Sequence, residues 1–270
     1  MAALGALVGK GGTLVLSGAG LSTESGIPDY RGPSGLRRNA QPMTYQTFTR
    51  DAVARRRYWA RSHLGWRTIA RATPNAGHHA VGRLQGLGLL SGVITQNVDG
   101  LHQAGGAAGV VELHGALDRV ICLDCGALSP RAELDARLGA ANAGYAAEAG
   151  EINPDGDVEL TDEQAAGFVV VDCTACGGML KPDVVFFGES VPAPRVEACF
   201  ELVERSAALL VLGSSLTVMS GRRFVVRAAK LGVPVAIVNQ GPTRGDALAA
   251  LRLDAPLGAV LSRLAWDLRN

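Results

Sequence analysis

The sequence predicts an α/β fold, with a Rossmann-like parallel sheet and a smaller inserted module that contains a helical part and a four-cysteine zinc ribbon. Short apolar runs recur along the chain, and each ends on glycine or polar residues. Helical patterns separate several of these runs, as at Ala193–Arg205 and Gly221–Leu231. Two CxxC pairs interrupt the alternation in the middle of the chain. A repeated order of strand, polar end and helix is typical of a parallel sheet that binds ligands at the carboxyl ends of its strands.

The overall composition excludes several classes of partner. Among the 270 residues, 26 basic side chains face 25 acidic ones, so the net charge of +1 gives no electrostatic footprint for nucleic acid or an acidic membrane. No apolar run has the length of a bilayer span, and the first ten residues have the wrong charge order for a secretory signal. We therefore expect a cytoplasmic protein that binds neither nucleic acid nor membranes. The oligomeric state is not predicted, and a monomer is compatible with the sequence.

Five apolar runs are expected to be strands of the parallel sheet. They are Thr13–Ser17, Gly92–Thr95, Val184–Phe187, Ala207–Leu212 and Val233–Val238. Four strand ends carry polar residues or glycine, and although a helix cap or a turn explains any one of them, it does not readily explain all four. We expect these ends to meet in one crevice, and they are Ser17–Gly20, Thr95–Asp99, Gly213–Ser215 and Asn239–Gly241.

Two segments break the alternation, and we expect them to form the inserted module. Residues 37–74 carry a basic helical stretch that contains aromatic residues, and residues 120–181 carry the cysteine pairs. The remaining residues, 1–36, 75–119 and 182–270, form the Rossmann-like domain in this interpretation.

The run that begins at Leu14 enters a glycine turn and then a polar loop that ends at Arg31. Gly18 and Gly20 would let the backbone approach a pyrophosphate, and N–H groups at a helix start would point at it. An ordinary tight turn after a buried strand is the alternative, because glycine-rich turns are common. No third glycine follows at the spacing of the dinucleotide-binding fingerprint, which argues against a dehydrogenase.

The cysteines predict a metal site. Cys122, Cys125, Cys173 and Cys176 form two CxxC pairs, and glycine follows each pair. Four thiolates suit one tetrahedral Zn²⁺ and leave no open coordination position, so the metal would be structural. A redox role for either pair is the minor alternative. Cys199 lies on an apolar helix and is expected to be a core residue.

His114 is the candidate general base. It follows Glu112-Leu113 at the boundary of the inserted module, and an imidazole titrates near neutral pH. The other four histidines are expected to be structural, and they are His63, His78, His79 and His102.

The segment Lys181–Glu189 returns the chain from the cysteine pairs to the sheet. One interpretation is a plain core strand. The other is an exposed edge, at which Gly188 and Glu189 are available to pair with an extended peptide.

Taken together, these motifs resemble the sirtuins over nearly the whole chain and in the order of that family. The matching segments are Gly18–Ser22, Gly26–Arg31, Thr95–Asp99, Glu112–Gly115, both CxxC pairs, Pro182–Glu189, Gly213–Ser215 and Asn239. Finer features resemble class II, the group of the mitochondrial sirtuin four, and they are Arg57–Arg61, Leu123–Gly126, Pro154–Val158, Lys181–Gly188 and Gly241–Arg244.

The resemblance implies an NAD-dependent protein-lysine deacylase that consumes NAD as a co-substrate. The acyl oxygen of a modified lysine would attack the nicotinamide ribose carbon and expel nicotinamide, which needs positioning and a water-poor pocket more than a strong nucleophile. His114 would then act as general base through the ribose hydroxyls, and water would complete the hydrolysis to O-acyl-ADP-ribose. Asn97, the second catalytic residue by this resemblance, would order the ribose and a water. Acyl-lysine proteins or peptides are the implied partners.

The resemblance also implies the contacts with NAD. Asp99 and Ile27 would hold the nicotinamide amide, and the segment Gly26–Arg31 would be a lid over the nicotinamide pocket. Tyr30 stands where the family commonly has Phe, which keeps the shielding ring and adds a hydroxyl. Gly18, Ala19, Gly20 and Ser22 would cradle the pyrophosphate, and the other contacts are Pro28, Asp29, Gln96, Asn97, Gly213, Ser214, Ser215, Asn239, Gln240 and Gly241.

On the substrate side, the resemblance points to Val184, Val185, Phe186, Phe187, Gly188 and Glu189. Tyr58 and Arg61 stand at the Tyr-x-x-Arg spacing that sirtuins preferring acidic acyl groups also show. Helix positions three apart share a face, so both side chains could reach one carboxylate. A solvated basic helix face with Trp59 packed inward explains the pattern equally well.

Two other functions remain open at this point. A protein mono-ADP-ribosyltransferase would use the same site with a protein nucleophile. A non-catalytic NAD-sensing binding module is the third possibility, and the presence of Asn97, Asp99 and His114 argues against it.

Overall fold

The structure is a computed structural model that describes residues 1–29, 42–145, 158 and 160–269. Its largest element is a six-stranded sheet of order β3-β2-β1-β7-β8-β9, in which every neighbouring pair is parallel. The strands are β1 (Thr13–Ser17), β2 (Leu90–Thr95), β3 (Val110–Glu112), β7 (Ala208–Leu212), β8 (Val235–Val238) and β9 (Leu251–Leu253).

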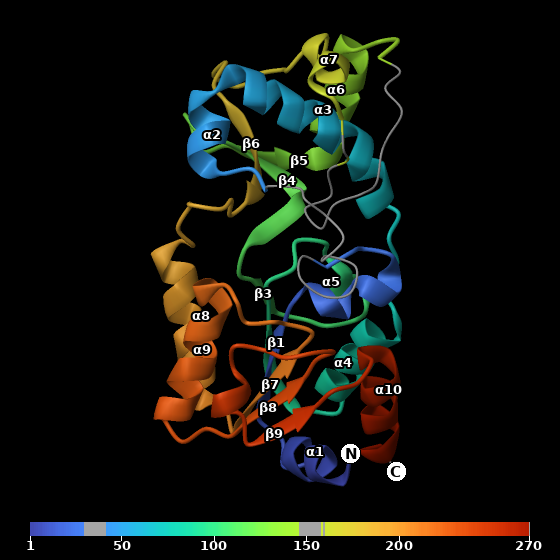
Figure 1. Ribbon diagram of the computed structural model, residues 1–270, viewed down its shortest axis with the longest axis vertical. Helices are drawn as coiled ribbons and strands as arrows, with labels where there is room; N and C mark the ends of the chain where they lie inside the picture. The colour runs from blue at the N-terminus through green and yellow to red at the C-terminus, as the bar shows by residue number, and fades with distance from the viewer. Residues whose placement is uncertain (30–41, 146–157, 159, 270) are drawn as a thin grey trace.

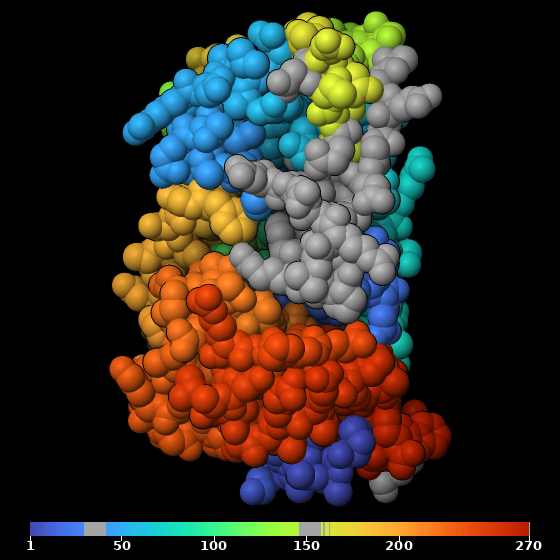
Figure 2. All heavy atoms as spheres, in the orientation of Figure 1, coloured from blue at the N-terminus to red at the C-terminus, as the bar shows by residue number. Residues whose placement is uncertain are grey.

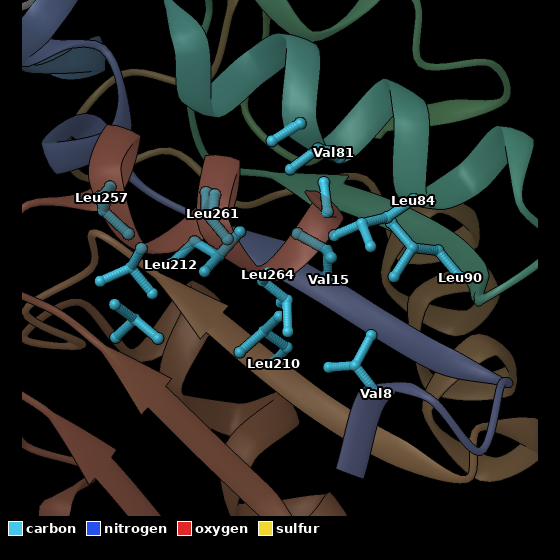
Figure 3. Close-up of a cluster of buried hydrophobic side chains, with 14 of the residues drawn as sticks. Val8, Val15, Val81, Leu84, Leu90, Leu210, Leu212, Leu257, Leu261 and Leu264 are labelled. Atoms are coloured by element: carbon cyan, nitrogen blue, oxygen red, sulfur yellow. The ribbon is translucent and has the colours of Figure 1, made fainter. Parts of the chain in front are cut away.

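Helices cover both faces of this sheet (Figure 1). One face packs against α1 (Ala2–Val8), α4 (Ala76–Gly86) and α10 (Leu257–Asp267), and the other against α8 (Ala193–Arg205) and α9 (Met219–Lys230). Figure 3 shows the first core, where Val81 of α4 and Leu264 of α10 lie over Val15 and Leu210 of the sheet. Every residue of β1, β7 and β8 is buried, because helices cover both faces of the sheet. Strands in such a position typically carry nearly continuous apolar runs.

A smaller module lies at the far end of the molecule from α1 and α10 (Figure 1). Its antiparallel sheet of order β5-β4-β6 contains β4 (Gly115–Cys122), β5 (Leu128–Pro130) and β6 (Leu180–Val184). Four helices pack around the same core, and they are α2 (Tyr45–Arg50), α3 (Ala52–Ile69), α6 (Arg131–Ala141) and α7 (Asp162–Ala166). In the space-filling view, red and dark-blue residues form one end of the molecule, and light-blue, yellow and green residues form the other (Figure 2).

The predicted fold class is confirmed, since the parallel sheet and the cysteine-bearing module are both present. One predicted strand is wrong: Val184–Phe187 does not join the parallel sheet. The strand instead runs over Leu180–Val184 and pairs antiparallel with β4. The pattern of apolar residues does not mark the bounds of this strand. Lys181 is polar but belongs to the strand, whereas the apolar Phe186 lies beyond it and packs in the core of the module.

Short 3₁₀ turns cover Ala19–Leu21, Thr23–Ser25 and Asp246–Leu248, and α5 (Leu101–Ala104) follows β2. None of the helices in the described ranges has the length and apolar character that a bilayer crossing requires.

Candidate active site

A pocket of about 1450 Å³ opens at the carboxyl ends of the parallel strands. It brings the four strand ends together with the segment after β6 and with the start of α9. Most residues singled out from the sequence line it, and they are Gly18, Ala19, Gly20, Ser22, Ile27, Asp29, Gln96, Asn97, Asp99, His114, Val184, Val185, Phe186, Phe187, Gly188, Glu189, Gly213, Ser214, Ser215, Asn239, Gln240 and Gly241.

Among the described residues, three that were singled out for NAD or substrate are not in this lining. Pro28 is half-buried beside it. Tyr58 and Arg61 lie on α3 in the smaller module. Tyr30 and Arg31, the last two residues of the expected lid, lie outside the residues that the structure describes.

Glycine lets the ends of β1 and β7 meet backbone to backbone. The Gly20 N–H donates to the Gly213 carbonyl at 2.9 Å. Gly213 has a φ of +60°, and a Cβ on it would stand 2.5 Å from the Leu21 backbone nitrogen. A Cβ on Gly18 would stand 2.8 Å from the Ser214 Cβ. Both turns therefore present bare backbone to the pocket, which is the surface that a phosphate group needs.

A hydrogen-bonded group of three side chains lies beside this turn. The Asn97 Nδ2 donates to the Ser22 Oγ at 3.0 Å and to the Gly18 carbonyl at 3.2 Å. The Ser22 hydroxyl in turn donates to the Asp99 Oδ2 at 2.6 Å. Burial raises the pKa of Asp99, and its bonds with Ser22 and the Leu101 backbone N–H act in the opposite direction. The group fixes Asn97 and Asp99 relative to the glycine turn.

A second, fully buried chain of polar groups supports Asn97 from behind. The Ser17 Oγ donates to the Thr95 Oγ1 at 2.9 Å, and Thr95 Oγ1 also accepts from the Asn97 backbone N–H at 3.1 Å. The His102 Nε2 lies 2.7 Å from the Ser17 Oγ. Since the Ser17 hydrogen is used toward Thr95, His102 is the donor in that bond. The structure thus explains the structural role expected of His102.

His78 stands against His102, with ring centroids 5.3 Å apart. Its Nδ1 accepts from the Asn75 backbone N–H at 3.2 Å and so completes the capping box of α4. Burial lowers the pKa of His78 to about 4 and that of His102 to about 3. Both rings are therefore neutral at physiological pH, which lowers the cost of burying them. The His78 Nε2 and the His102 Nδ1 have no hydrogen-bond partner among the described residues.

Replacing Ser17 with alanine is expected to destabilise the protein by about 1–3 kcal/mol, because the buried His102 N–H loses its acceptor. The free energy of unfolding in urea measures this loss. Ser91→Ala is the matched control, since the Ser91 hydroxyl makes only an exposed bond to the Gly12 carbonyl. Equal stability of the two variants would show that the buried chain contributes nothing.

His114 lies in the connection between β3 and β4 and is held at both ring nitrogens. Its Nδ1 lies 2.9 Å from the Gln96 carbonyl oxygen, and its Nε2 lies 2.9 Å from the Ser220 Oγ. Burial lowers the pKa of His114, and the cationic Arg195 and Arg223 act in the same direction, against the opposing effect of the Gln96 bond. A neutral imidazole that donates from Nδ1 has its lone pair on Nε2, which is the form that a general base needs.

The segment after β6 forms one wall of the pocket. The Val185 N–H donates to the His114 carbonyl at 2.8 Å, and the Tyr45 N–H donates to the Phe187 carbonyl at 2.9 Å. Glu189 accepts from the Phe186 N–H at 2.8 Å and pairs with the buried Lys181 at 3.2 Å. The residues after Val184 thus form a braced loop, whereas Lys181–Val184 belong to β6, as the interpretation of a core strand expected.

Tyr58 lies behind that wall, and Arg61 follows it on the same helix. Tyr58 is only 2% exposed, and its ring centroid lies 5.2 Å from that of Phe186 and 5.4 Å from that of Phe48. The Arg61 Nε donates to the Val158 carbonyl at 2.7 Å. Trp59 is packed inward, as expected.

The four paired cysteines form one cluster at the tip of the smaller module. Their sulfur atoms all lie within 4.8 Å of one another, and Cys122 and Cys176 approach to 3.5 Å. Zinc–sulfur bonds of about 2.3 Å in a tetrahedron require sulfur separations of about 3.8 Å, so this donor set fits zinc. Gly126 and Gly177 have φ values of +72° and +73°, which explains why glycine follows each pair. Cys199 is buried in the core on α8.

The sequence reasoning missed the part of the pocket that comes from the start of α9. Met219, Ser220 and Arg223 line it together with the turn before them. A hydroxyl-rich run from Ser214 to Ser220 was the available signal. Its last serine lies beyond the strand end, inside the helix, where side chains are not usually read as part of a site.

Comparisons with known proteins agree with this geometry. A model described as the Sir2 family matches residues 18–220. An NAD-dependent protein deacetylase 1 of Streptomyces coelicolor is 66% identical, over 94% of this chain and 85% of that protein. A protein of the same name from Mycobacterium avium is 51% identical, over 94% of this chain and 90% of that protein.

Solved structures match over most of the chain as well. A Sir2–p53 peptide–NAD+ complex has a TM-score of 0.77 at 28% identity, and the match covers 94% of this chain and 92% of that one. A Sir2 protein bound to acetylated peptide has a TM-score of 0.79 at 26% identity, covering 99% and 98% of the two chains. The family model alone spans more than half of the sequence. The chain therefore belongs to the Sir2 family.

Proposed function

We propose that this protein is an NAD-dependent protein-lysine deacylase that transfers an acyl group from lysine to ADP-ribose and releases nicotinamide. The observation that carries the proposal is that His114 lies in the same pocket as the hydrogen-bonded group of Asn97, Ser22 and Asp99. The deacetylase names of the bacterial relatives and the peptide complexes of the solved structures support it.

The volume of the pocket and the polar groups that line it suit NAD. Backbone from Gly18 to Gly20 would hold the pyrophosphate, with Ser22 beside it. Asp99 and Ile27 would hold the nicotinamide amide, and Ser214, Ser215, Asn239, Gln240 and Gly241 would hold the adenosine half. When bound, NAD supplies nicotinamide as a leaving group and ADP-ribose as the acyl acceptor.

The residues of this chain then supply position and proton transfer. Asn97 is held from its backbone N–H and from its side-chain amide, so it offers a fixed contact for the ribose and a water. His114 accepts a proton from the ribose hydroxyls at Nε2, while its Nδ1 hydrogen stays with the Gln96 carbonyl. Ile27 and Phe186 give the pocket apolar walls that limit the access of water.

The acyl-lysine substrate would lie along the braced loop, over Val184–Glu189. We place Cys122, Cys125, Cys173 and Cys176 around one zinc ion. The ion would crosslink two parts of the smaller module that lie far apart in the sequence. Four thiolates leave no position for a substrate, so the role of the metal is structural.

Three finer assignments are proposals that rest mainly on the sequence. They are membership of class II, a smaller module of residues 37–74 and 120–181, and a cytoplasmic location. The packing of α2, α3, α6 and α7 around the core of β4 and β6 supports the division into modules. The segments Lys181–Gly188 and Gly241–Arg244 support class II.

We also propose a preference for acidic acyl groups, such as glutaryl, through Arg61 and Tyr58. The contact between the Tyr58 and Phe186 rings ties this part of α3 to the pocket wall and supports the proposal. Arg61→Met is expected to lower the rate on glutaryl-lysine relative to acetyl-lysine about tenfold, because a charge-assisted bond is lost. Arg67→Met, on an exposed face of the same helix, is the control. An unchanged ratio of rates in Arg61→Met would contradict the preference.

The proposed function is tested with a panel of acyl-lysine peptides, incubated with and without NAD and analysed by mass spectrometry. Deacylation predicts nicotinamide, free lysine peptide and O-acyl-ADP-ribose, all dependent on NAD. ADP-ribose attached to protein would instead identify the ADP-ribosyltransferase. NAD binding with no turnover on any peptide would identify the binding module.

A further inference from the structure

The Ser220 side chain contacts Nε2 of His114, the candidate general base. Ser220 is the second residue of α9, and its Oγ lies 2.9 Å from the His114 Nε2. The N-cap residue of α9 is Val218, so Ser220 stands inside the first turn and not at the capping position. Its hydroxyl points across to His114.

Close packing fixes this arrangement. A Cβ on Gly221 would stand 2.5 Å from the Gln96 Oε1, so glycine allows the first turn of α9 to press against Gln96. The Gln96 carbonyl in turn lies 2.9 Å from the His114 Nδ1. Gln96 Nε2 also donates to Ser214 Oγ at 2.8 Å, which anchors it to the end of β7. The first turn of α9, the Gln96 residue and the imidazole of His114 are therefore packed against one another.

The direction of the two hydrogen bonds follows from the partners. A carbonyl oxygen only accepts, so Nδ1 of His114 carries a hydrogen. The charged groups that act on the ring are Arg195 on α8 and Arg223 on α9, and both disfavour a second proton. Nε2 therefore carries a lone pair, and the Ser220 hydroxyl donates to it.

We propose that Ser220 is a positioning residue for the deacylation proposed above: its hydroxyl occupies the Nε2 lone pair in the free enzyme, holds the ring in the Nδ1–H tautomer and aims Nε2 into the pocket. The ribose hydroxyl takes over this hydrogen bond when the substrates bind. The ring is then already oriented, so proton transfer needs no rotation of the imidazole.

The first test needs no turnover. Nitrogen-15 NMR of the ligand-free protein reports whether the Nε2 lone pair accepts a hydrogen bond, and His114→Gln assigns the signal. In Ser220→Ala, the Nε2 resonance is expected to move toward that of an imidazole with a free lone pair. Ser220→Thr keeps the hydroxyl and is expected to restore the original position. An Nε2 resonance that is the same in Ser220→Ala as in the unchanged protein would overturn the proposal.

The second test separates kcat from KM. Ser220→Ala is expected to lower kcat about threefold to tenfold at an unchanged KM for NAD, because the hydroxyl orients the base and does not bind NAD. Ser220→Thr is expected to recover kcat, and Ser91→Ala is the control far from the pocket. Alanine is a good helix former, so α9 should persist in the variant.

The outcomes separate the two proposals. If the unchanged protein turns over no acyl peptide, the proposed function fails, while the NMR result still decides whether Ser220 holds His114. If turnover occurs but Ser220→Ala retains full kcat, or loses affinity for NAD instead, the positioning role fails and the proposed function stands.

Discussion

Replacing His114 with glutamine is expected to reduce NAD-dependent deacylation by about 10²- to 10⁴-fold in kcat/KM, the usual contribution of a positioned general base. Glutamine keeps a polar side chain of similar reach but cannot take up a proton at neutral pH. Initial rates of O-acyl-ADP-ribose formation, measured by mass spectrometry on an acetyl-lysine peptide, give the loss. Binding of NAD should be retained, because the glycine turn and the Asn97 group are untouched.

His79→Gln is the matched control for this experiment. His79 is exposed on α4, next to the buried His78, and is not among the residues that line the pocket. Its replacement should leave the rate unchanged. Comparable losses in the two variants, or full activity of His114→Gln, would remove His114 from the mechanism.

The pH profile gives a further readout on the same residue. Burial lowers the pKa of His114 from its ordinary value of 6.5, so the base stays neutral below that pH. In the unchanged protein, the acidic limb of kcat/KM should therefore lie below pH 6.5. Along this limb, kcat/KM falls with decreasing pH because protonation of Nε2 removes the lone pair that the base needs.

Replacing Cys173 with serine is expected to abolish zinc binding and to unfold the smaller module. A structural zinc contributes about 10–16 kcal/mol of apparent binding free energy in small zinc-binding domains, and that energy is available for folding. The cluster joins segments that are distant in sequence, since Cys125 and Cys173 approach to 3.9 Å. Metal analysis should find one zinc per chain in the unchanged protein, and circular dichroism should record an early melting step in the variant.

Cys199→Ala is the control for the zinc prediction. This thiol is at least as buried as the cluster thiols but lies on α8, against the parallel sheet. The variant should keep one zinc per chain and lose only the modest stability of a small core truncation. A Cys173→Ser protein that retains zinc and melts at the same temperature as Cys199→Ala would contradict a structural role for the metal.

The parts that could be predicted from the sequence share one physical cause. Strands such as β1 and β7 are covered on both faces, so they appear as unbroken apolar runs, and their polar ends mark the site. The cysteine cluster is equally clear, because ligand type and spacing define it without knowledge of the fold.

The parts that could not be predicted depend on tertiary packing. Strands β3 and β9 have three residues each, which is too short for a pattern to emerge. The apolar run after Lys181 does not reveal which sheet it joins, because pairing with β4 decides that. Ser220 enters the site through the close contact of Gly221 with Gln96, and no local sequence pattern encodes such a contact.

The strand order has a consequence for how the protein is made. β1 lies in the interior of the sheet, where Thr13 pairs with Leu90 on one side and with Ala208 on the other. A ribosome delivers β1 and β2 long before β7, so the nascent chain carries β1 with at least one hydrogen-bonding edge bare until Ala208–Leu212 emerge. Bare edges of apolar strands recruit other chains. The interval before β7 emerges is therefore the stage at which this protein most needs a chaperone.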